Sequence, residues 1–212
     1  EETSTESEPS ESIKVPKNIN FVTTANIKEL IYDDITMTNM KGGLALKDEK
    51  VNINNITANM LGGNAKINGA YSTKKAGKPE IDFKYNIKDF DIKQSFNQVN
   101  TISKIAPIAQ FLDGKFSSQF GFSSLLDDDF TPDLSMLDGL GDINISYANF
   151  LNFPLFKSVS EATKIPLLNN LDKATIKNAS TIFKIENGKV NVEPFDYAYQ
   201  DIKMNLRGSN GF

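Results

Sequence analysis

The sequence predicts a mainly β fold, an elongated and curved antiparallel sheet of repeated meanders with two short helical insertions. Three observations support this prediction. Apolar and polar residues alternate strictly over residues 81–87 (IDFKYNI), which is the period of a half-buried strand. Turn residues separate such segments, and Asn187-Gly188 is the strongest hairpin signal among them. A segment near the start of the chain also recurs near its end, which indicates repeated structural units.

The recurring segment covers residues 46–69 (LKDEKVNINNITANMLGGNAKING) and residues 185–208 (IENGKVNVEPFDYAYQDIKMNLRG). The two copies align without a gap at a constant offset of 139 residues, so that Val190 falls on Val51. Most apolar positions correspond, although few residues are identical. A turn near the start of each copy, at Asp48-Glu49 or Asn187-Gly188, joins an incoming strand to an outgoing one.

The outgoing strand changes the parity of its apolar positions at the same place in both copies, at Asn54-Asn55 and at Glu193-Pro194. Such a change would move the apolar side chains to the opposite face of the sheet. One extra residue in the strand keeps them on the same face, so a β-bulge is predicted there. A second turn follows, and then a strand that ends on Gly69 or Gly208. Each copy is therefore predicted to be a three-stranded meander.

The remaining strands follow from alternation of the same kind. Candidate strands lie at residues 116–122, 143–147 and 176–185. Bulges bend a strand, so we expect a curved sheet whose concave face is apolar.

Two segments depart from alternation and predict the helical insertions. Across Ser95–Asp113 apolar residues recur every three or four positions, with a kink expected at Pro107, which has no N–H to donate. This helix has an apolar stripe that must be buried, so we expect it to cover part of the concave face or one end of it. Pro154–Thr163 starts with proline at a favourable first helical position and ends before Pro166.

The first residues differ from the rest of the chain. Residues 1–16 begin EETSTESEPSE, an acidic and nearly apolar-free stretch that predicts a disordered linker. Residues 17–212 form one β-rich domain. Because the chain has no initiator methionine and stops abruptly at Phe212, we interpret it as a segment excised from a longer protein.

Composition excludes several classes of function. The net charge is −4 and the pI about 5.0, which argues against a nucleic-acid partner, because affinity for phosphates comes from Lys and Arg. The chain has no Cys and no His, so it lacks thiolate and imidazole groups for metal binding or nucleophilic catalysis. Its apolar runs are far shorter than the roughly 20 residues of a membrane span.

Three short motifs have an ordinary structural interpretation. Asp127-Asp128-Asp129 lacks the spaced ligands of a calcium loop and is typical of a solvated turn. Ser72-x-x-Lys75 lies in a Lys-rich turn without the partner motifs of penicillin-binding enzymes. Gly139-Leu140-Gly141 leads into a strand instead of a helix, unlike a dinucleotide-binding loop. We therefore predict no enzymatic activity, no catalytic residue, no metal ligand and no cofactor.

Aromatic and aliphatic residues gather on one face of the candidate strands. They have two interpretations: an ordinary core between sheet and helices, which residue type favours, or an apolar groove for acyl chains such as those of phospholipids. The residues in question are Ile81, Phe83, Tyr85, Phe116, Phe120 and Phe122.

The order of elements in the second half resembles a known family. Residues 111–145 (FLDGKFSSQFGFSSLLDDDFTPDLSMLDGLGDINI) contain a Leu-x-Gly-x-Phe strand, an acidic loop with proline and a Leu-x-Gly-x-Gly-x-Ile strand. After a helical stretch, residues 174–211 (ATIKNASTIFKIENGKVNVEPFDYAYQDIKMNLRGSNG) contain F-x-I-x-N-G-K-V-x-V-x-P-F and a strand ending in glycine. This pattern resembles the C-terminal region of the AsmA family in its Bacteroidetes form, from about Lys17 onward.

The resemblance implies an inner-membrane protein, anchored by a segment outside this sequence, with a long periplasmic β-groove. It further implies a role in outer-membrane biogenesis through phospholipid transfer. The chain departs from the family by ending at Phe212, where the family's sheet continues. The alternative is a structural or adhesive β-repeat module at the cell surface, and the location of the intact protein distinguishes the two.

Overall fold

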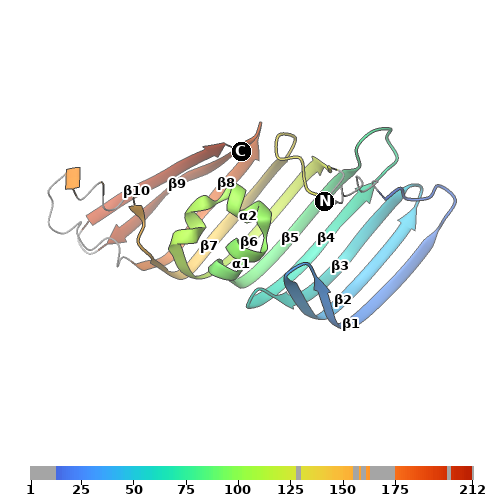
Figure 1. Cartoon of the computed structure of the whole chain (residues 1–212), viewed down its shortest axis with the longest axis horizontal. Helices are drawn as coiled ribbons and strands as arrows, with labels where there is room; N and C mark the ends of the chain where they lie inside the picture. The colour runs from blue at the N-terminus through green and yellow to red at the C-terminus, as the bar shows by residue number, and fades with distance from the viewer. Residues whose placement is uncertain are drawn as a thin grey trace, which may run out of the picture.

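The computed structural model describes residues 13–127, 130–154, 158, 161–162, 175–199 and 202–211. Its described strands form a single antiparallel sheet in which every strand pairs with its neighbours in the chain (Figure 1). The strands are β1 (Phe21–Tyr32), β2 (Ile35–Lys47), β3 (Lys50–Met60), β4 (Gly63–Ser72), β5 (Glu80–Asp91), β6 (Leu112–Leu125), β7 (Asp138–Phe150), β8 (Thr175–Glu186), β9 (Lys189–Tyr199) and β10 (Ile202–Gly211). The mainly β prediction is confirmed.

The two predicted meanders are present, as β2-β3-β4 and β8-β9-β10, and their pairing registers correspond. Gly69 lies opposite Ile53, and its counterpart Gly208 lies opposite Val192. Beyond the bulge, Ile67 pairs with Ile56 just as Leu206 pairs with Phe195, again 139 residues later. The offset found in the sequence is therefore an offset in structure. The last strands run past the predicted ends at Gly69 and Gly208, to Ser72 and Gly211.

The predicted bulges are confirmed at both positions. In β3 the register shifts between Ile53 and Ile56, and in the β9–β10 pair between Leu206 and Gly208. Asn55 adopts the left-handed region (φ 48°), which Asn tolerates better than most residues. Its N–H, which the bulge removes from the ladder, donates to Asn68 Oδ1 at 2.8 Å.

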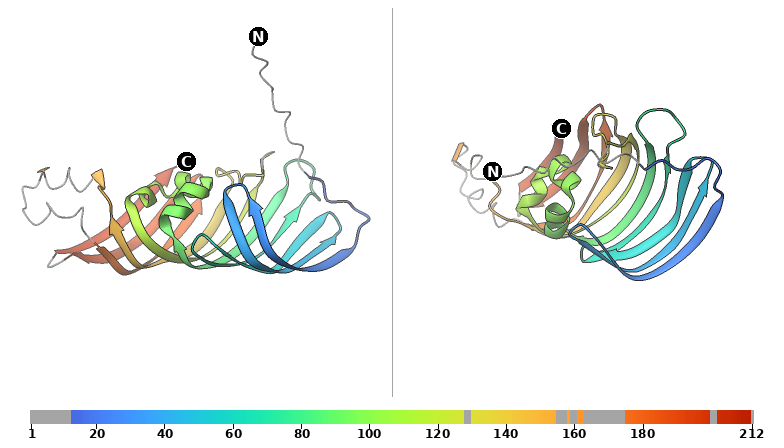
Figure 2. Two further views of the ribbon diagram at one scale, coloured as in Figure 1. Left: turned by 60° about the horizontal axis from the view of Figure 1, so that its bottom comes forward. Right: turned by 45° about the vertical axis from the view of Figure 1, so that its right-hand side comes forward.

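A bulge of the same type interrupts β5, where the register shifts between Ile87 and Phe90. Asp89 has a φ of 56°, and its N–H donates to Ser117 Oγ at 3.1 Å. Because bulges increase local twist and bend, their recurrence explains the curvature of the sheet seen in Figure 2.

The helical insertion differs from the single helix predicted over Ser95–Asp113. It consists of α1 (Ile92–Gln98), α2 (Asn100–Ile105) and the 3₁₀ helix η1 (Pro107–Phe111), and Leu112 and Asp113 already belong to β6. Figure 2 shows these helices on the concave side of the sheet, as expected.

The boundaries of these helices have local causes. Asp91 Oδ1 accepts a hydrogen bond from the Gln94 N–H at 2.8 Å, so this N-cap starts α1 three residues before the predicted position. Val99, a β-branched residue with extended backbone, separates α1 from α2. Pro107 disfavours helical geometry at Ala106 and occupies the first turn of η1, so it divides the segment instead of kinking it.

The other two sequence predictions about segments lie largely outside the described residues. These are the helix at Pro154–Thr163, of which only a few residues are described, and the linker up to residue 12. Ile13 and Val15 are held against the sheet, since the Tyr71 hydroxyl donates to Ile13 O at 2.7 Å and the Val15 N–H to Thr73 Oγ1 at 3.0 Å. Val15 is buried, so the linker predicted for residues 1–16 does not extend to Pro16.

Gly69 and Gly208 provide a matched pair for a stability test. A Cβ at Gly69 would lie 2.6 Å from Asp82 O and 2.6 Å from the Phe83 ring, whereas a Cβ at Gly208 has no neighbour within 4 Å. We expect Gly69→Ala to lower the free energy of unfolding by about 1–3 kcal/mol through this overlap. Gly208→Ala is expected to leave it within about 0.5 kcal/mol. Urea unfolding of both variants at low protein concentration checks this, and equal effects would contradict the packing described.

Candidate functional site

The concave face of the sheet is apolar across most of its strands. Residues directly opposite in an antiparallel pair share a face, so the register can be followed from strand to strand. One such row runs through Leu44, Ile53, Gly69, Phe83, Phe122, Gly139, Ile185 and Val190. The adjacent row on the convex face is mostly polar, with Asn52, Asp82, Ser123 and Asp138.

The six residues considered for a groove all lie on this concave face, in its central part. Across β5 and β6, Phe83 stacks on Phe122 at 6.0 Å between ring centroids, and Tyr85 meets Phe120 edge-on at 5.7 Å. Phe116 packs edge-on against Phe90 at 6.2 Å. Of the six, Ile81 and Phe120 are buried and the other four are half-buried.

Protein segments cover this central part. Phe120 belongs to a cluster with Ile185 and Val190, onto which Ile105 of α2 packs. Leu134 and Leu137, from the connection between β6 and β7, join the same cluster. A second cluster, around Ile92 and Phe150, lies between α1 and strands β6–β8. The predicted residues are therefore largely occupied by contacts within the chain.

Two hydrogen-bonding contacts extend the cover along the face. Asn210 Nδ2 on β10 donates to the carbonyl oxygen of Lys104 in α2 at 3.1 Å, so the helical insertion reaches the last strand. At the other side, the segment Ile13–Val15 is hydrogen-bonded to Tyr71 and Thr73 at the end of β4. Among the residues that the structure describes, these elements leave one part of the concave face without such a cover, over β1–β3.

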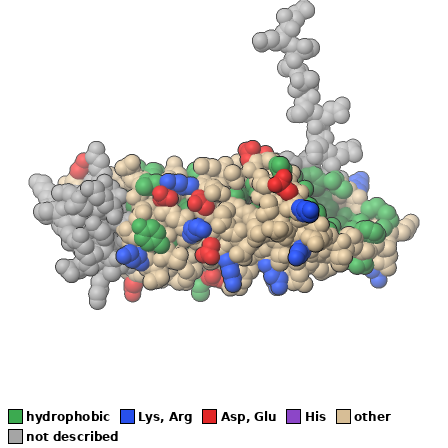
Figure 3. Space-filling model, turned by 90° about the horizontal axis from the view of Figure 1, so that it is seen from below, with side chains coloured by type: hydrophobic (Ala, Val, Ile, Leu, Met, Phe, Trp, Pro, Cys, Tyr) green, Lys and Arg blue, Asp and Glu red, His purple; other side chains and the backbone are tan. Residues whose placement is uncertain are grey.

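The concave face of β1–β3 is apolar and accessible. On β1, Phe21 is 51% exposed and Tyr32 68% exposed, and their partners on β2 are Leu46 and Ile35. Ala58 on β3 is buried, whereas the following larger apolar side chains of this part of the face are half-buried or exposed: Ile27, Leu30, Met37, Met40, Leu44, Val51, Ile53 and Ile56. Figure 3 shows hydrophobic side chains gathered in a hollow at the end of the molecule that these strands form. We call this set of side chains the open face.

Sequence reasoning missed the open face, although a pattern in the chain indicates it. Apolar residues alternate over residues 40–46 (MKGGLAL) with glycine at one inward position, and over residues 21–27 (FVTTANI) with Thr23 and Ala25 inward. The small or polar residues interrupt the alternation that identified the central strands.

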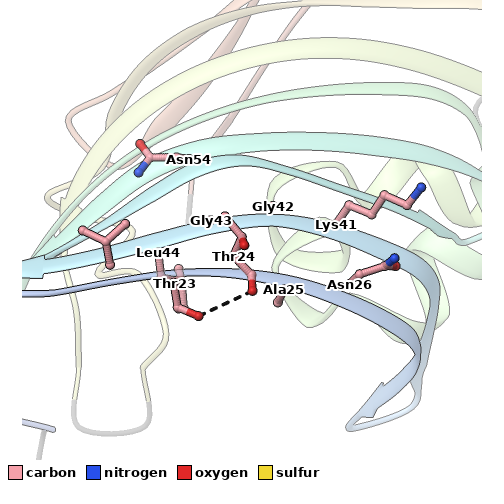
Figure 4. A pocket seen from close by; sticks show the side chains of 10 residues that line it. Thr23, Thr24, Ala25, Asn26, Lys41, Gly42, Gly43, Leu44 and Asn54 are labelled. Carbon is pink, nitrogen blue, oxygen red and sulfur yellow. Dashed lines mark hydrogen bonds between the residues drawn. The ribbon is translucent and has the colours of Figure 1, made fainter.

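A shallow depression of about 450 Å³ lies against the same strands (Figure 4). Gly42 and Gly43 place no side chain there, and Lys41 and Asn26 contribute polar groups at one end. Most of the side chains that line it, those of Val22, Thr24, Asn26, Lys41 and Asn54, belong to the convex-facing set of the pairing register, so the depression does not enlarge the open face.

The motifs considered for catalysis or metal binding form simple ion pairs at the surface. Lys75 Nζ lies 2.6 Å from Glu80 Oε1, and Lys78 Nζ lies 2.5 Å from Asp127 Oδ1. Asp128 and Asp129 are outside the described residues. In the part of the chain that the structure describes, no group of three or more acidic side chains is placed to hold a metal ion.

Tyr85 is the ionisable group of the central cluster with a shifted pKa. Burial raises the pKa of its hydroxyl, a hydrogen bond with Ser118 opposes this, and the charge of Asp142 raises the pKa further. The net direction is upward, so the folded protein holds this proton more tightly than the unfolded chain does.

We expect the free energy of unfolding to fall as the pH rises through the alkaline range. The contribution of Tyr85 is fully present below about pH 10, the ordinary pKa of tyrosine, and is lost as the pH rises through its higher pKa in the folded state. Urea unfolding at a series of alkaline pH values measures the slope. Tyr85→Phe removes the ionisable group and should flatten the curve, whereas equal slopes for the two proteins would contradict the assignment.

Comparisons of the chain with protein-family models, with curated protein sequences and with solved structures gave no match. Among the described residues, no helix is both long enough and apolar enough to cross a lipid bilayer.

Proposed function

We propose that this chain is a non-enzymatic, AsmA-like periplasmic domain that holds acyl chains of phospholipids on its concave face and takes part in outer-membrane biogenesis. The observation that carries the proposal is the open face, an apolar surface on β1–β3 next to a central part that the chain covers itself. The location, and attachment to the inner membrane through a segment outside this sequence, follow from the family resemblance.

The energetics of the open face favour an apolar ligand. Apolar surface in contact with water costs about 25 cal/mol per Å², and contiguous exposed patches mark interaction sites. An acyl chain removes such surface from water without needing hydrogen bonds. Among the described residues, no buried side-chain nitrogen or oxygen lacks a hydrogen-bond partner, so the interior holds no unsatisfied polar group aimed at a polar ligand.

The chemistry of the chain supports a binding role over an enzymatic one. With neither His nor Cys, the groups that most often serve as general base and nucleophile are missing from the sequence. Lys75, the lysine of the Ser72-x-x-Lys75 motif, forms an ion pair with Glu80 at the surface.

Lipid content tests the proposal directly. The protein is purified without detergent, extracted with organic solvent, and the extract analysed for phospholipid by mass spectrometry. A second sample is mixed with vesicles of phosphatidylethanolamine and phosphatidylglycerol and then separated from them. We expect phospholipid in the first extract or transfer to protein in the second, and a protein that carries none and takes up none would refute acyl-chain binding.

The location of the intact protein separates this proposal from an adhesive or structural module. We expect it in the inner-membrane fraction, with this domain protected from protease in whole cells and digested once the outer membrane is permeabilised. Digestion in whole cells would favour the cell-surface alternative.

A further inference from the structure

The first copy of the repeat differs from the second at the turn that borders the open face. In the second copy the turn Asn187-Gly188 is flanked by Glu186 and Lys189, which lie opposite each other and carry opposite charges. At the offset of 139 residues their counterparts are Lys47 and Lys50, which also lie opposite each other. Like charges directly opposite in a sheet destabilise it. The first copy therefore has a cross-strand repulsion where the second has complementary charges.

The backbone of this turn is also less favourable than that of its counterpart. Asp48 and Glu49 both adopt the left-handed region, with φ of 51° and 61°, whereas Gly188 occupies the second position of the other turn at 69°. Glycine enters this region without steric cost, and glutamate does not. Departures from such local rules concentrate at functional sites. Together the two departures point to a bound anion, which offsets the repulsion between Lys47 and Lys50.

Three segments far apart in the chain meet at this end of the strands. The Thr73 N–H, just after β4, donates to Glu49 O at 3.0 Å, and the Val15 N–H donates to Thr73 Oγ1 at 3.0 Å. Lys17 Nζ lies 3.8 Å from Glu49 Oε1. Residues 13–17, 47–50 and 73–74 thus form one connected unit. We call its exposed lysines the basic rim: Lys14, Lys17, Lys47, Lys50 and Lys74.

The basic rim borders the open face directly. Leu46 and Val51 form the last inward pair of β2 and β3, and the lysines at 47 and 50 are the next pair, at the end of the ladder. Their backbone positions belong to the convex-facing set, but a lysine has a flexible four-carbon stem that can extend past the end of the sheet. Residues 13–17 lie on the concave side, where the Tyr71 hydroxyl donates to Ile13 O at 2.7 Å. An anion at this edge is therefore accessible to lysines from both sides.

The two ends of the open face differ in charge. In the three segments of the rim, five lysines outnumber two acidic residues, Asp48 and Glu49. Except for Lys17, these lysines form no ion pair with another described residue. At the far end of β1 and β2, the turn consists of the exposed Asp33 and Asp34. Coulomb interactions thus favour an anionic group at the rim and disfavour it at the far end.

We propose that the basic rim binds the anionic headgroup of a phospholipid whose acyl chain lies along the open face. The inference rests on the proposed acyl-chain binding and adds the headgroup class and the orientation of the lipid. An acyl chain spans about 15 Å, half of the roughly 30 Å hydrocarbon core of a bilayer, which corresponds to about four or five residues of a strand. From the rim it passes Leu44, and its end lies near Gly42 and the opposite residue Ala25.

Competition between two headgroups within one vesicle tests the headgroup class. The vesicles contain phosphatidylglycerol and phosphatidylcholine with identical acyl chains and distinguishable labels, so that both lipids are offered from the same surface. We expect the protein to take up the anionic lipid with about threefold or greater preference, because each exposed charge pair contributes modestly. The preference should decrease as the ionic strength rises, since salt screens such pairs.

Lys47→Gln combined with Lys50→Gln should remove most of this preference and leave uptake of phosphatidylcholine within about twofold. The matched control combines Lys66→Gln with Lys88→Gln. These two lysines are exposed on the convex face, opposite Asn86 and Asn64, and they lie outside the rim. The control removes the same charge and should retain the preference.

Equal uptake of both lipids by the unmodified protein overturns the inference but leaves acyl-chain binding intact. That result means that the rim has another counter-ion, such as the glutamates within residues 1–11. Equal loss of preference in the two double variants also overturns it, because the effect then comes from net charge. Uptake of neither lipid refutes acyl-chain binding, and the inference with it.

Two photoreactive phospholipids test the orientation. One carries the reactive group on the headgroup, and the other carries it at the end of an acyl chain. We expect the first to modify residues 47–50 and 73–74, and the second to modify inward residues around Ala25 and Gly42. The reverse pattern, or headgroup labelling at Asp33-Asp34, overturns the proposed orientation.

Discussion

Replacing Phe120 with alanine is expected to lower the free energy of unfolding by about 3–5 kcal/mol. Phe120 is 6% exposed and contacts three other aromatic rings, those of Tyr85, Phe122 and Phe183, at centroid distances of 5.1–5.7 Å. Truncation leaves a cavity beneath α2 and the β6–β7 connection, both of which pack on the same cluster. Urea or thermal unfolding measures the effect.

Phe21→Ala is the matched control, because it removes the same ring from the concave face where Phe21 is 51% exposed. Its expected cost is below about 1 kcal/mol, since about half of the residue is already in contact with water. If Phe120→Ala proved as mild as Phe21→Ala, the cover over the central part of the face would be wrong, and the groove would extend beneath the helices.

A negative charge at Leu44 is expected to weaken phospholipid uptake by about tenfold or more. Leu44 lies on the open face, opposite Thr23 and Ile53. Contact with a leucine side chain is worth up to about 1.5–3 kcal/mol, and 1.4 kcal/mol corresponds to a factor of ten in affinity. A carboxylate there also has to lose water when an acyl chain covers it. Transfer of labelled phospholipid from vesicles to Leu44→Asp measures the change.

Ala45→Asp is the control for this substitution. Ala45 is the next residue on β2, also half-buried, and it faces the convex side opposite Asn52. The same charge is thus added to the same strand, and uptake should stay within about twofold of the unmodified protein. Far-UV circular dichroism establishes that both variants are folded. Equal loss in the two variants would indicate an effect on the sheet as a whole instead of on a binding face.

The strands and bulges were predictable because their causes are local. Alternation with period 2 marks a face, and the parity change at Asn54-Asn55 is visible without knowledge of any contact. The repeat made the prediction stronger, since Glu193-Pro194 shows the same change in a different sequence. Both bulges are present in the structure.

The helical insertion was less predictable because two competing patterns overlap at its ends. Asp91 caps α1, yet it follows the alternating residues of β5 and is the last residue of that strand. The helix is interrupted at Val99, whose β-branched side chain only weakly disfavours helical structure. In the sequence this weak effect is hidden by apolar residues that recur every three or four positions. Asp91 is a typical N-cap residue, but it predicts the start of α1 only if a strand is allowed to end directly on the N-cap.

The division of the concave face into a covered and an open part was beyond sequence reasoning. It depends on contacts far apart in the chain, such as Asn210 with Lys104 and Ile105 with the cluster around Phe120. Residue type indicated an apolar face, but the aromatic residues that drew attention to β5 and β6 lie under the cover. The more accessible part has smaller inward residues, including Thr23, Ala25 and Gly42.

The most direct test of the central claim is to map where a phospholipid acyl chain touches the protein. A phosphatidylethanolamine with a photoactivatable group on one acyl chain is loaded from vesicles, irradiated, and the modified residues identified by mass spectrometry. The account predicts cross-links to inward residues of β1–β3, such as Leu44, Leu46 and Ile53, and their loss in Leu44→Asp. Cross-links confined to the convex face, or spread evenly over both faces, would contradict it.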